Sequence, residues 1–454
     1  MTTGIAARPF SGVEGPGRAA LALAALCSAA GQLTGWQELL WLGLLALASF
    51  VACDWIRVRS SGRTVMALAL TLSAVTAALL PAARPVILSA ATQGLGFTAL
   101  LVALATLRPA MQRSRLLAQA AAWLIGRPRG QRYASVTYGG HGLALIFNVG
   151  VLQLIGDILA AARLDFARHP TARHLLMATM RGSAAIALWS PLAMGFAVVT
   201  SSFAKLDPLA YIALGMALAL VLLGTGCLLP RHDRAETLDL PSDGNARAMA
   251  LLLLGALTLL ATTSALYLFA GLSFLTATTL VVPVFALVWI RLEPDADGAR
   301  AAPAALASRL SDLRNEMFIF AGSTVIGALA ALLFTLYGPQ SIIAFDSPLM
   351  PVAVLLTIWG LSVISTPPSI PVILIAQLMA TSPLAQGHAL SLAMALSAGW
   401  SLGMMVSPVS ATLLLSARIA GEPARRIAWD WNRAYTAIAV PLTSAALALT
   451  YLLE

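Results

Sequence analysis

The chain has 454 residues, of which 59% are hydrophobic and only 10% are charged, with a mean hydropathy of +0.85. Soluble domains carry about 25% charged residues, so this composition excludes an ordinary soluble protein and indicates a membrane protein with many spans. The formal net charge of +9 comes from arginines placed between apolar runs, which indicates membrane topology and argues against nucleic-acid binding.

Apolar runs of about 20 residues, the length that crosses a bilayer as a helix, recur along nearly the whole sequence. After a short cytoplasmic tail we expect eleven membrane-spanning helices, at 18–34, 36–56, 64–81, 87–107, 172–203, 207–230, 248–273, 275–293, 318–338, 388–417 and 433–453. Two other apolar stretches, 133–162 and 350–382, carry polar residues, Gly or Pro at their middle. We interpret each as a re-entrant hairpin, which enters and leaves the membrane on one side. The predicted fold class is an all-α polytopic membrane protein.

The arginines give the orientation, because cytoplasmic loops carry an excess of Lys and Arg. With the N-terminus inside, the eleven spans place every arginine-rich loop in the cytoplasm and leave only Arg84 and Lys205 outside. The segments that flank the second hairpin contain no Lys or Arg. We therefore expect the first hairpin to open from the cytoplasm and the second from the outside. The C-terminus is then outside, and a bacterial inner membrane is the expected location.

The chain is predicted to divide into a tail with two helices, a first repeat, a cytoplasmic linker and a second repeat, at 1–63, 64–230, 231–247 and 248–454. Cys27, Cys53 and Cys227 show no CxxC or Cys/His spacing, so we expect neither a disulfide framework nor a metal site. The sequence contains no P-loop, which argues against ATP-driven transport.

Two predicted spans contain a Ser-Pro pair at their centre, Ser190-Pro191 in ALWSPLAMG and Ser407-Pro408 in MMVSPVSAT. Proline has no N–H and clashes with the preceding turn, so each pair breaks or kinks its helix. The two hairpins are interrupted at Asn148 and Ser365, and each interruption precedes its Ser-Pro pair by the same separation in sequence. The step from Asn148 to Ser365 therefore equals the step from Ser190 to Ser407, and we call this step the repeat offset. Five predicted crossings separate equivalent points, so the halves are inverted in the membrane, as is typical of secondary transporters.

A helix broken inside the membrane frees carbonyls at one half-helix end and N–H groups at the other, and such groups survive only against protein or a wet cavity. The carbonyls can bind a cation and the N–H ends an anion. A single kink is usually structural, and helical Ser or Thr often bonds to its own backbone, but the spacing repeated twice favours binding. The predicted ligand-binding residues are Asn148, Val149, Gly150, Ser190, Pro191, Ser365, Thr366, Pro367, Ser369, Ser407, Pro408, Ser410 and Thr412.

Four more residues are candidates for lining or coupling. His141, on the first hairpin, could titrate or touch substrate, and a packed, hydrogen-bonded histidine is the alternative. Asp157 is the clearest acid inside an apolar stretch, suited to proton coupling or to an interfacial pair with an arginine. Arg181 lies about 13 Å of helix before the first break and could attract an anion or anchor the helix at the interface. Trp189 could wall the site.

The tips FNVG (147–150) and ISTPPS (364–369), with the breaks WSPLAMG (189–195) and VSPVSAT (406–412), resemble those of the ion transporter superfamily, in particular the divalent-anion/sodium symporters. The resemblance covers about 64–453, in topology more than in identity. It implies a homodimer, a static scaffold from the early helices of each half, and a transport domain that moves as an elevator. It also implies that the tips and breaks hold sodium and a carboxylate. Of the family's Ser-Asn-Thr triplet, the first tip matches only the asparagine.

The sequence thus predicts a secondary active transporter, and not an enzyme, for a small carboxylate or oxyanion coupled to sodium or protons. The expected partners are the anion, membrane lipids and a second copy of the chain, with no cofactor other than sodium ions. The first alternative is a cation/proton antiporter of the same fold, whose expected pair of buried acids is reduced here to Asp157. The second is a membrane enzyme that processes glycans or lipids, but the longest loops have the composition of solvated linkers.

Overall fold

The computed structural model describes residues 15–107, 114–161, 166, 169–229, 244–292, 306–308, 310–339 and 345–454. The regular structure within these segments is entirely helical. The predicted tail 1–14 and most of the predicted linker, 231–243, lie outside the described residues. The predicted all-α class is confirmed for the described chain.

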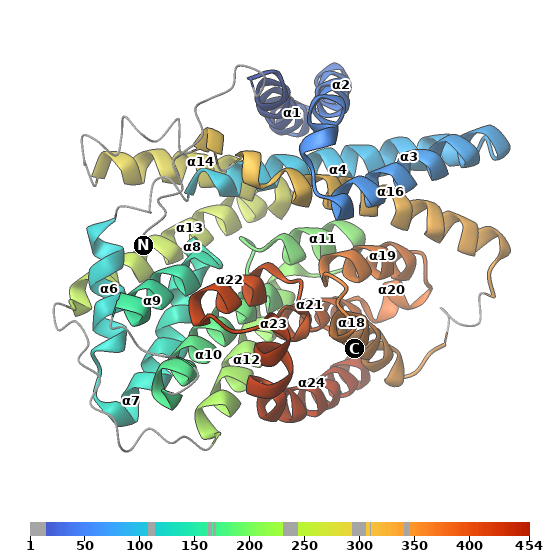
Figure 1. Cartoon of the computed structure of the whole chain (residues 1–454). Helices are drawn as coiled ribbons and strands as arrows, with labels where there is room; N and C mark the ends of the chain where they lie inside the picture. The colour runs from blue at the N-terminus through green and yellow to red at the C-terminus, as the bar shows by residue number, and fades with distance from the viewer. Residues whose placement is uncertain are drawn as a thin grey trace.

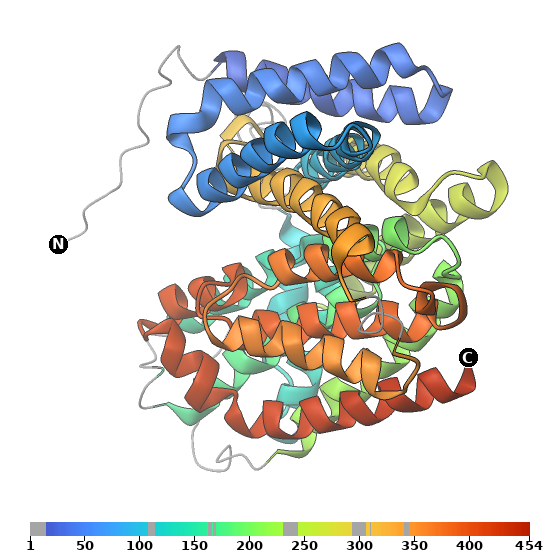
Figure 2. The same cartoon turned by 90° about the vertical axis from the view of Figure 1, so that its right-hand side faces the viewer.

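Six helices form a first layer, which lies over the rest of the molecule in Figure 2: α1 (Gly15–Thr34), α2 (Gln37–Asp54), α3 (Ser60–Leu79), α4 (Ala83–Ala105), α14 (Phe274–Leu292) and α16 (Arg314–Tyr337). In this layer α1 packs on α2 and α4, and α16 packs on α3 and α4. The layer is tied at one end by buried Asp54, which accepts from Arg57 at 2.9 Å and lies 3.3 Å from Nε of Arg314.

The second layer contains the predicted hairpins, the broken helices and the helix after each (Figure 1). Its α-helices from the first half are α6 (Arg115–Ile125), α7 (Arg129–Ala134), α8 (Gly140–Phe147), α9 (Gly150–Ala161), α10 (Pro170–Ala185), α11 (Met194–Ser202) and α12 (Pro208–Leu228). Those from the second half are α18 (Leu349–Val363), α19 (Ser369–Ala380), α20 (Leu384–Gly387), α21 (Ala389–Val406), α22 (Ala411–Ala420), α23 (Ala424–Arg426) and α24 (Arg433–Leu453). The remaining helix, α13 (Ala246–Ala270), packs on α14 of the first layer and on α6 and α8 of the second.

The centre of the molecule lies in the second layer, along α10 and α21. Of the most apolar stretch of Ala389–Ala420, 89% of the residues are buried, against 28% for α2 and for α24. A helix that is apolar on every side belongs in an interior, whereas the half-buried helices leave apolar faces that suit lipid. The broken helices are therefore the core around which the rest packs.

Nine helices of the described chain are long and apolar enough to cross a membrane. They coincide with nine of the eleven predicted spans, while α1 occupies another and the broken pair α10–α11 the last. The structure also contains α6 in a stretch that the sequence predicted to be a loop. Ser114 caps α6 by accepting a hydrogen bond from the Leu117 N–H at 3.2 Å, and the buried face of α6 packs on α13.

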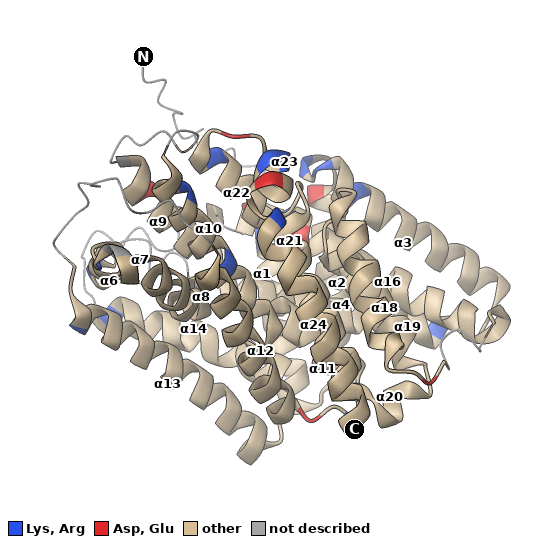
Figure 3. Ribbon diagram, turned by 90° about the horizontal axis from the view of Figure 1, so that it is seen from below, with Lys and Arg blue, Asp and Glu red and all other residues tan. Residues whose placement is uncertain are grey.

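Charged side chains gather at the ends of the helices. Figure 3 shows Lys and Arg around α10, α22 and α23 at one edge of the molecule, with long uncharged stretches of helix leading away from it. The opposite edge holds a small polar cluster, in which His388 lies 3.9 Å from carboxylates of Asp346 and Glu454. Glu454 accepts hydrogen bonds from the first N–H groups of α21, at Leu390 and Ser391. The charges thus lie at two edges separated by apolar helix.

Candidate functional site: the hairpin tips and broken helices

Each predicted hairpin is a pair of helices joined at a tip with unusual backbone. α8 and α9 meet at Asn148-Val149, and α18 and α19 meet at 364–368. Asn148 (φ +50°, ψ −128°) and Ser365 (φ +75°) are the two non-glycine residues with positive φ in the part of the chain that the structure describes. Such conformations cost free energy for a residue with a side chain, and they cluster at ligand sites. The strained residues are the two at which the sequence predicted an interruption.

The first break lies between α10 and α11. After one 3₁₀ turn the helix ends, and α11 begins at Met194. Ser190 Oγ accepts a hydrogen bond from the Leu192 N–H at 3.2 Å, and the carbonyl of Pro191 accepts one from Thr278 Oγ1 of α14 at 3.4 Å. Both Ser190 and Pro191 are buried. The backbone groups freed by the break are therefore partly hydrogen-bonded, by the Ser190 side chain within a short turn and by Thr278 of the first layer.

The second break lies between α21 and α22, at 407–410. Ser410 begins α22 as its N-cap, because its Oγ accepts from the Leu413 N–H at 3.2 Å while donating to the carbonyl of Met404 at 2.7 Å. Ser407 and Pro408 are buried. A serine hydroxyl thus bridges the end of one half-helix and the start of the next.

Side chains tie each break to its hairpin. Ser407 Oγ donates to the carbonyl of Thr366 at the second tip, at 2.9 Å. In the first half the indole N–H of Trp189 donates to His141 Nε2 at 3.2 Å, and His141 Nδ1 lies 2.9 Å from the carbonyl oxygen of Gly182. A carbonyl can only accept, so Nδ1 carries the proton and the ring is neutral. His141 is thus a buried histidine with both nitrogens engaged.

Two glycines let the hairpins approach the helices that follow them. A Cβ on Gly182 would lie 2.6 Å from the carbonyl oxygen of Thr137 and 3.0 Å from the nitrogen of His141. A Cβ on Gly399 would lie 2.8 Å from Cβ of Ile358. The repeat offset relates Gly182 to Gly399 and His141 to Ile358. The same close approach therefore occurs in both halves.

The helices α10 and α21 meet at a pair of residues related by the repeat offset. Ser401 Oγ donates to the carbonyl of Ala184 at 2.9 Å. In a molecule with two-fold related halves, equivalent residues can touch each other only beside the axis. The hydrogen bond between Ser401 and Ala184 is therefore the kind of contact expected beside a two-fold axis that relates two halves.

Three buried hydroxyls on the hairpins and broken helices have no hydrogen-bond partner in the described chain: those of Thr137, Ser183 and Thr412. Unpaired hydroxyls cost free energy in an interior, so they mark places suited to water or a ligand. The position equivalent to Thr412 is Gly195, where a Cβ would lie 3.2 Å from the ring of Trp400. The repeat offset thus relates the packed residues Trp400 and Gly195 to the hydroxyls of Ser183 and Thr412, and each of these two pairs has one member in each half.

The predicted site residues differ in accessibility. The breaks are buried, whereas Asn148 is exposed and the other tip residues are half-buried, namely Val149, Gly150, Ser365, Thr366, Pro367 and Ser369. Among the described residues no hydrogen bond joins the first tip to the second. Asp157 takes part in none of the tip contacts described above. It is exposed, and its carboxylate accepts a hydrogen bond from Gln153 Nε2 at 2.6 Å.

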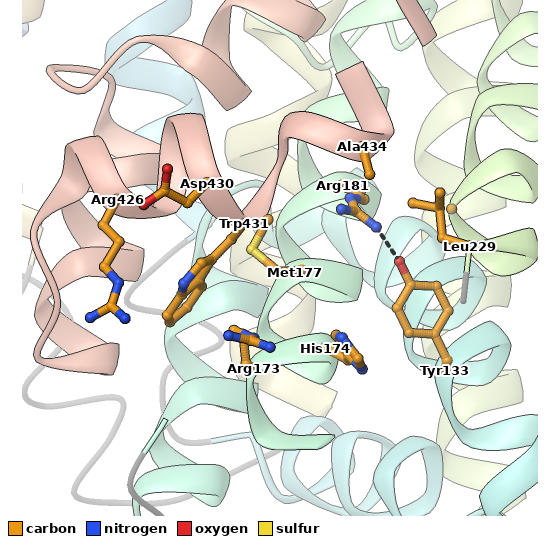
Figure 4. Close-up of a pocket in the computed structure, with 11 residues that line it drawn as sticks. Tyr133, Arg173, His174, Met177, Arg181, Leu229, Arg426, Asp430, Trp431 and Ala434 are labelled. Atoms are coloured by element: carbon orange, nitrogen blue, oxygen red, sulfur yellow. Dashed lines mark hydrogen bonds between the residues drawn. The ribbon is translucent and has the colours of Figure 1, made fainter. Parts of the chain in front are cut away.

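Arg181 lies in the last third of α10 and lines a pocket that contains none of the tip or break residues (Figure 4). Arg181 as a whole residue is 5% exposed. It donates from Nη1 to the hydroxyl of Tyr133 at 2.6 Å and from Nε and Nη2 to Oδ1 of Asn432 at 3.3 and 3.2 Å. The ring of Tyr435 lies 4.4 Å from its central carbon. Arg181 is therefore a buried cation, and not an exposed anchor.

Comparisons with known proteins find similarity in structure alone. No protein family matches the sequence, and no curated protein matches it at a significant level. The YdaH transporter of Alcanivorax borkumensis, a crystal structure with an unusual topology, superposes with a TM-score of 0.53. The match covers 86% of this chain and 95% of that one at 18% identity. The chain has the fold of a solved membrane transporter.

Within this transporter fold, several residues that shape the site were missed from the sequence. Gly182 and Gly399 could have been found by extending the repeat offset beyond the tips and breaks. Ser183 and Thr137 gave no signal, because a hydroxyl without a partner is recognised only in three dimensions. Asn432 lies 251 residues from Arg181, and no local pattern joins them.

Proposed function

We propose that the protein is a secondary active transporter that moves a small anion across a bacterial inner membrane by alternating access. The observation that carries the proposal is the pair of strained tips, Asn148 and Ser365, each followed by a broken helix at one common spacing. The similarity in fold to a known transporter and the nine long apolar helices of the described chain support it.

The proposed ligand site lies between the tips and the breaks. Ser407 already contacts the second tip through the carbonyl of Thr366. Half-helix ends offer N–H groups and a positive dipole to an anion, and the opposite ends offer carbonyls to a coupling cation. The unpaired hydroxyls of Ser183 and Thr412 add neutral oxygens. We propose a carboxylate or oxyanion as substrate and sodium or a proton as the coupling ion.

We further propose that the two halves are inverted repeats and that the second layer moves against the first. The equivalent contacts at Gly182 and Gly399, and the contact of Ser401 with Ala184, support the repeat. The separation of long first-layer helices from the hairpins and breaks supports an elevator mechanism. The first layer would then be the static scaffold and the dimer contact, with the N-terminus in the cytoplasm and the C-terminus outside.

The alternative of a cation/proton antiporter is less well supported. It needs acids buried beside the broken helices, and Asp157 is exposed and bonded to Gln153. His141, the other titratable candidate, has both ring nitrogens engaged. A membrane enzyme of glycan or lipid chemistry finds no support in the geometry of the tips and breaks.

Uptake into proteoliposomes tests the proposal. The purified protein would be screened for thermal stabilisation by acetate, succinate, citrate and phosphate, with and without sodium, because a true ligand stabilises the folded state. Uptake of the labelled anion would then be measured under a sodium or proton gradient. We expect Asn148→Ala, Ser365→Ala and Ser407→Ala each to reduce uptake by about tenfold or more, the effect of losing a hydrogen bond to a charged group.

The control is Thr262→Ala, because Thr262 is exposed on α13 and its hydroxyl only bonds back to the Thr258 carbonyl. This variant should retain full uptake. If the three tip and break variants also retain it, the site assignment is wrong. If reporter fusions place the loop at 338–350 in the cytoplasm, the inverted topology is wrong.

A further inference from the structure

A second polar cavity lies away from the tips and breaks. Its volume is about 330 Å³, within the range of pockets that hold small molecules. It is bounded by α10, by the end of α12 and by the π-helical turn Ile427–Trp431 before α24. Figure 4 shows Arg181 and Tyr133 at one end of it and Arg173, Trp431 and Arg426 toward the other.

Arg181 in this cavity has no counter-ion among the described residues. Its three polar and aromatic neighbours, Tyr133, Asn432 and Tyr435, are neutral. The acid in the cavity wall, Asp430, is exposed and is not within ion-pair distance of Arg181 in the described chain. A buried charge is costly in free energy unless it is paired, so this cation without a counter-ion among the described residues favours the binding of an anion.

The neighbours also leave hydrogen-bond donors on Arg181 unused. A guanidinium carries five N–H groups, and the contacts to Asn432 and Tyr133 use three. The amide of Asn432 is fixed by donating from Nδ2 to the carbonyl of Met405 at 3.0 Å, so its oxygen faces the arginine. The two remaining N–H groups match the paired oxygens of a carboxylate.

We propose that this cavity is an anion-binding site, separate from the tips and breaks, that takes a small organic acid with its carboxylate on Arg181. Arg181 precedes Ser190 by about 13 Å of helix, so one small ligand cannot occupy both places. Met177, Leu229 and Ala434 line the cavity beside the polar groups and suit an apolar body of the ligand.

The wall of the cavity favours anions over cations. Arg173, His174 and Arg426 line it together with a single acid, Asp430. Arg426 is held by Glu422 at 2.9 Å, and Arg173 lies over the ring of Trp431 at 5.5 Å. The phosphate of an anionic lipid offers the same oxyanion chemistry, and the experiment separates the two sources.

The test measures binding by the full-length protein in detergent, and it does not require transport. Benzoate and its neutral isostere benzamide would be titrated calorimetrically, with the wild type expected to bind benzoate at least tenfold more tightly. Asn432→Asp gives Arg181 a permanent internal counter-ion in a side chain of the same size, and we expect it to weaken benzoate binding at least tenfold. Arg181→Gln should also weaken benzoate binding at least tenfold. If Arg181→Gln does not fold, the result for Asn432→Asp tests the proposal.

A matched variant gives the opposite expectation. Arg418→Gln removes an arginine of α22 that does not line the cavity, and it should bind benzoate as the wild type does. Equal affinity for benzoate and benzamide, or binding retained in Asn432→Asp, would overturn the proposal.

The lipid source is tested with the same protein. Phosphatidylglycerol or phosphatidylcholine would be added during the benzoate titration. If neither lipid changes the affinity, the site is for a soluble acid, as proposed. If phosphatidylglycerol alone abolishes benzoate binding, the site belongs to a lipid headgroup and the organic-acid assignment is overturned.

Discussion

Asn148 and Ser365 occupy backbone conformations that glycine adopts at no cost. A residue with a side chain in such a region costs about 1–3 kcal/mol. Glycine is the usual solution where only the turn matters, and this chain places an amide and a hydroxyl there instead. The tips therefore carry polar side chains at positions where glycine would relieve the strain.

Glycine substitution separates the side chain from the turn. Asn148→Gly and Ser365→Gly keep the positive φ without strain, so we expect the thermal midpoint of each variant to stay level or rise. We expect uptake to fall at least tenfold, because the polar group is lost. Asn148→Val, with a β-branched side chain at positive φ, should lower the midpoint. Full uptake by both glycine variants would show that the tips act through their backbone alone.

At the scale of elements, each hairpin makes a close crossing on the helix that follows it, and further helices such as α16 and α22 pack on its arms. The crossings depend on Gly182 in α10 and Gly399 in α21, where a Cβ has no room. The obstacle at Gly182 is backbone of the hairpin, whereas at Gly399 it is the side chain of Ile358. The two crossings therefore differ in how firmly they oppose a larger residue.

Alanine at these glycines should displace the hairpins. We expect Gly182→Ala and Gly399→Ala each to destabilise the protein by about 1–3 kcal/mol through overpacking, measured as a lower thermal midpoint in detergent. Gly182→Ala should be the worse of the two, since backbone cannot move aside as a side chain can. The control is Gly360→Ala in α18, where a Cβ meets nothing within 4 Å. Equal midpoints for all three variants would contradict this account.

At the scale of the whole molecule, the two layers are joined by few polar contacts among the described residues. Gln377 of α19 donates to Gln93 of α4 at 2.8 Å, and Gln93 donates to Ser201 of α11 at 2.9 Å. Most of the remaining contact is apolar packing of α16 on α19 and of α4 and α14 on α11. Such an interface can slide, because nondirectional packing is re-formed at a new register more readily than a buried ionic network.

Cross-linking tests the sliding of the layers. In a background with Cys27, Cys53 and Cys227 replaced by alanine, Gln93→Cys and Gln377→Cys would be bridged by a reducible bis-methanethiosulfonate cross-linker, because the amide ends of the two long side chains are in contact and a direct disulfide needs close backbones. We expect transport to stop on cross-linking and to return on reduction. The control bridges Gln32→Cys and Thr276→Cys, a hydrogen-bonded pair within the first layer, and its cross-linking should leave transport unchanged. Transport that continues through a cross-linked Gln93–Gln377 pair would exclude the proposed movement.

The features predictable from the sequence were those with a local cause. A long apolar run predicts a membrane helix and a Ser-Pro pair a break, so α21 and α22 lie where the sequence indicated. α6 was missed because its 11 residues are too few to cross a membrane and it lies in an arginine-rich stretch. The surroundings of Arg181 were missed because Tyr133 and Asn432 reach it from distant parts of the chain. Whether an intramembrane arginine is an anchor or a buried cation depends on such contacts.

The repeat offset relates Ser183 to Trp400 and Gly195 to Thr412. This difference in side chains between equivalent positions has a consequence for substrate specificity. A duplicated fold contains two copies of each backbone surface. If the side chains on both copies were identical, a ligand would bind both surfaces equally well. Here one surface is closed by an indole against a glycine, and its twin carries buried hydroxyls without partners in the described chain. In the proposed repeat, a substrate would therefore meet different side chains at equivalent positions of the two halves.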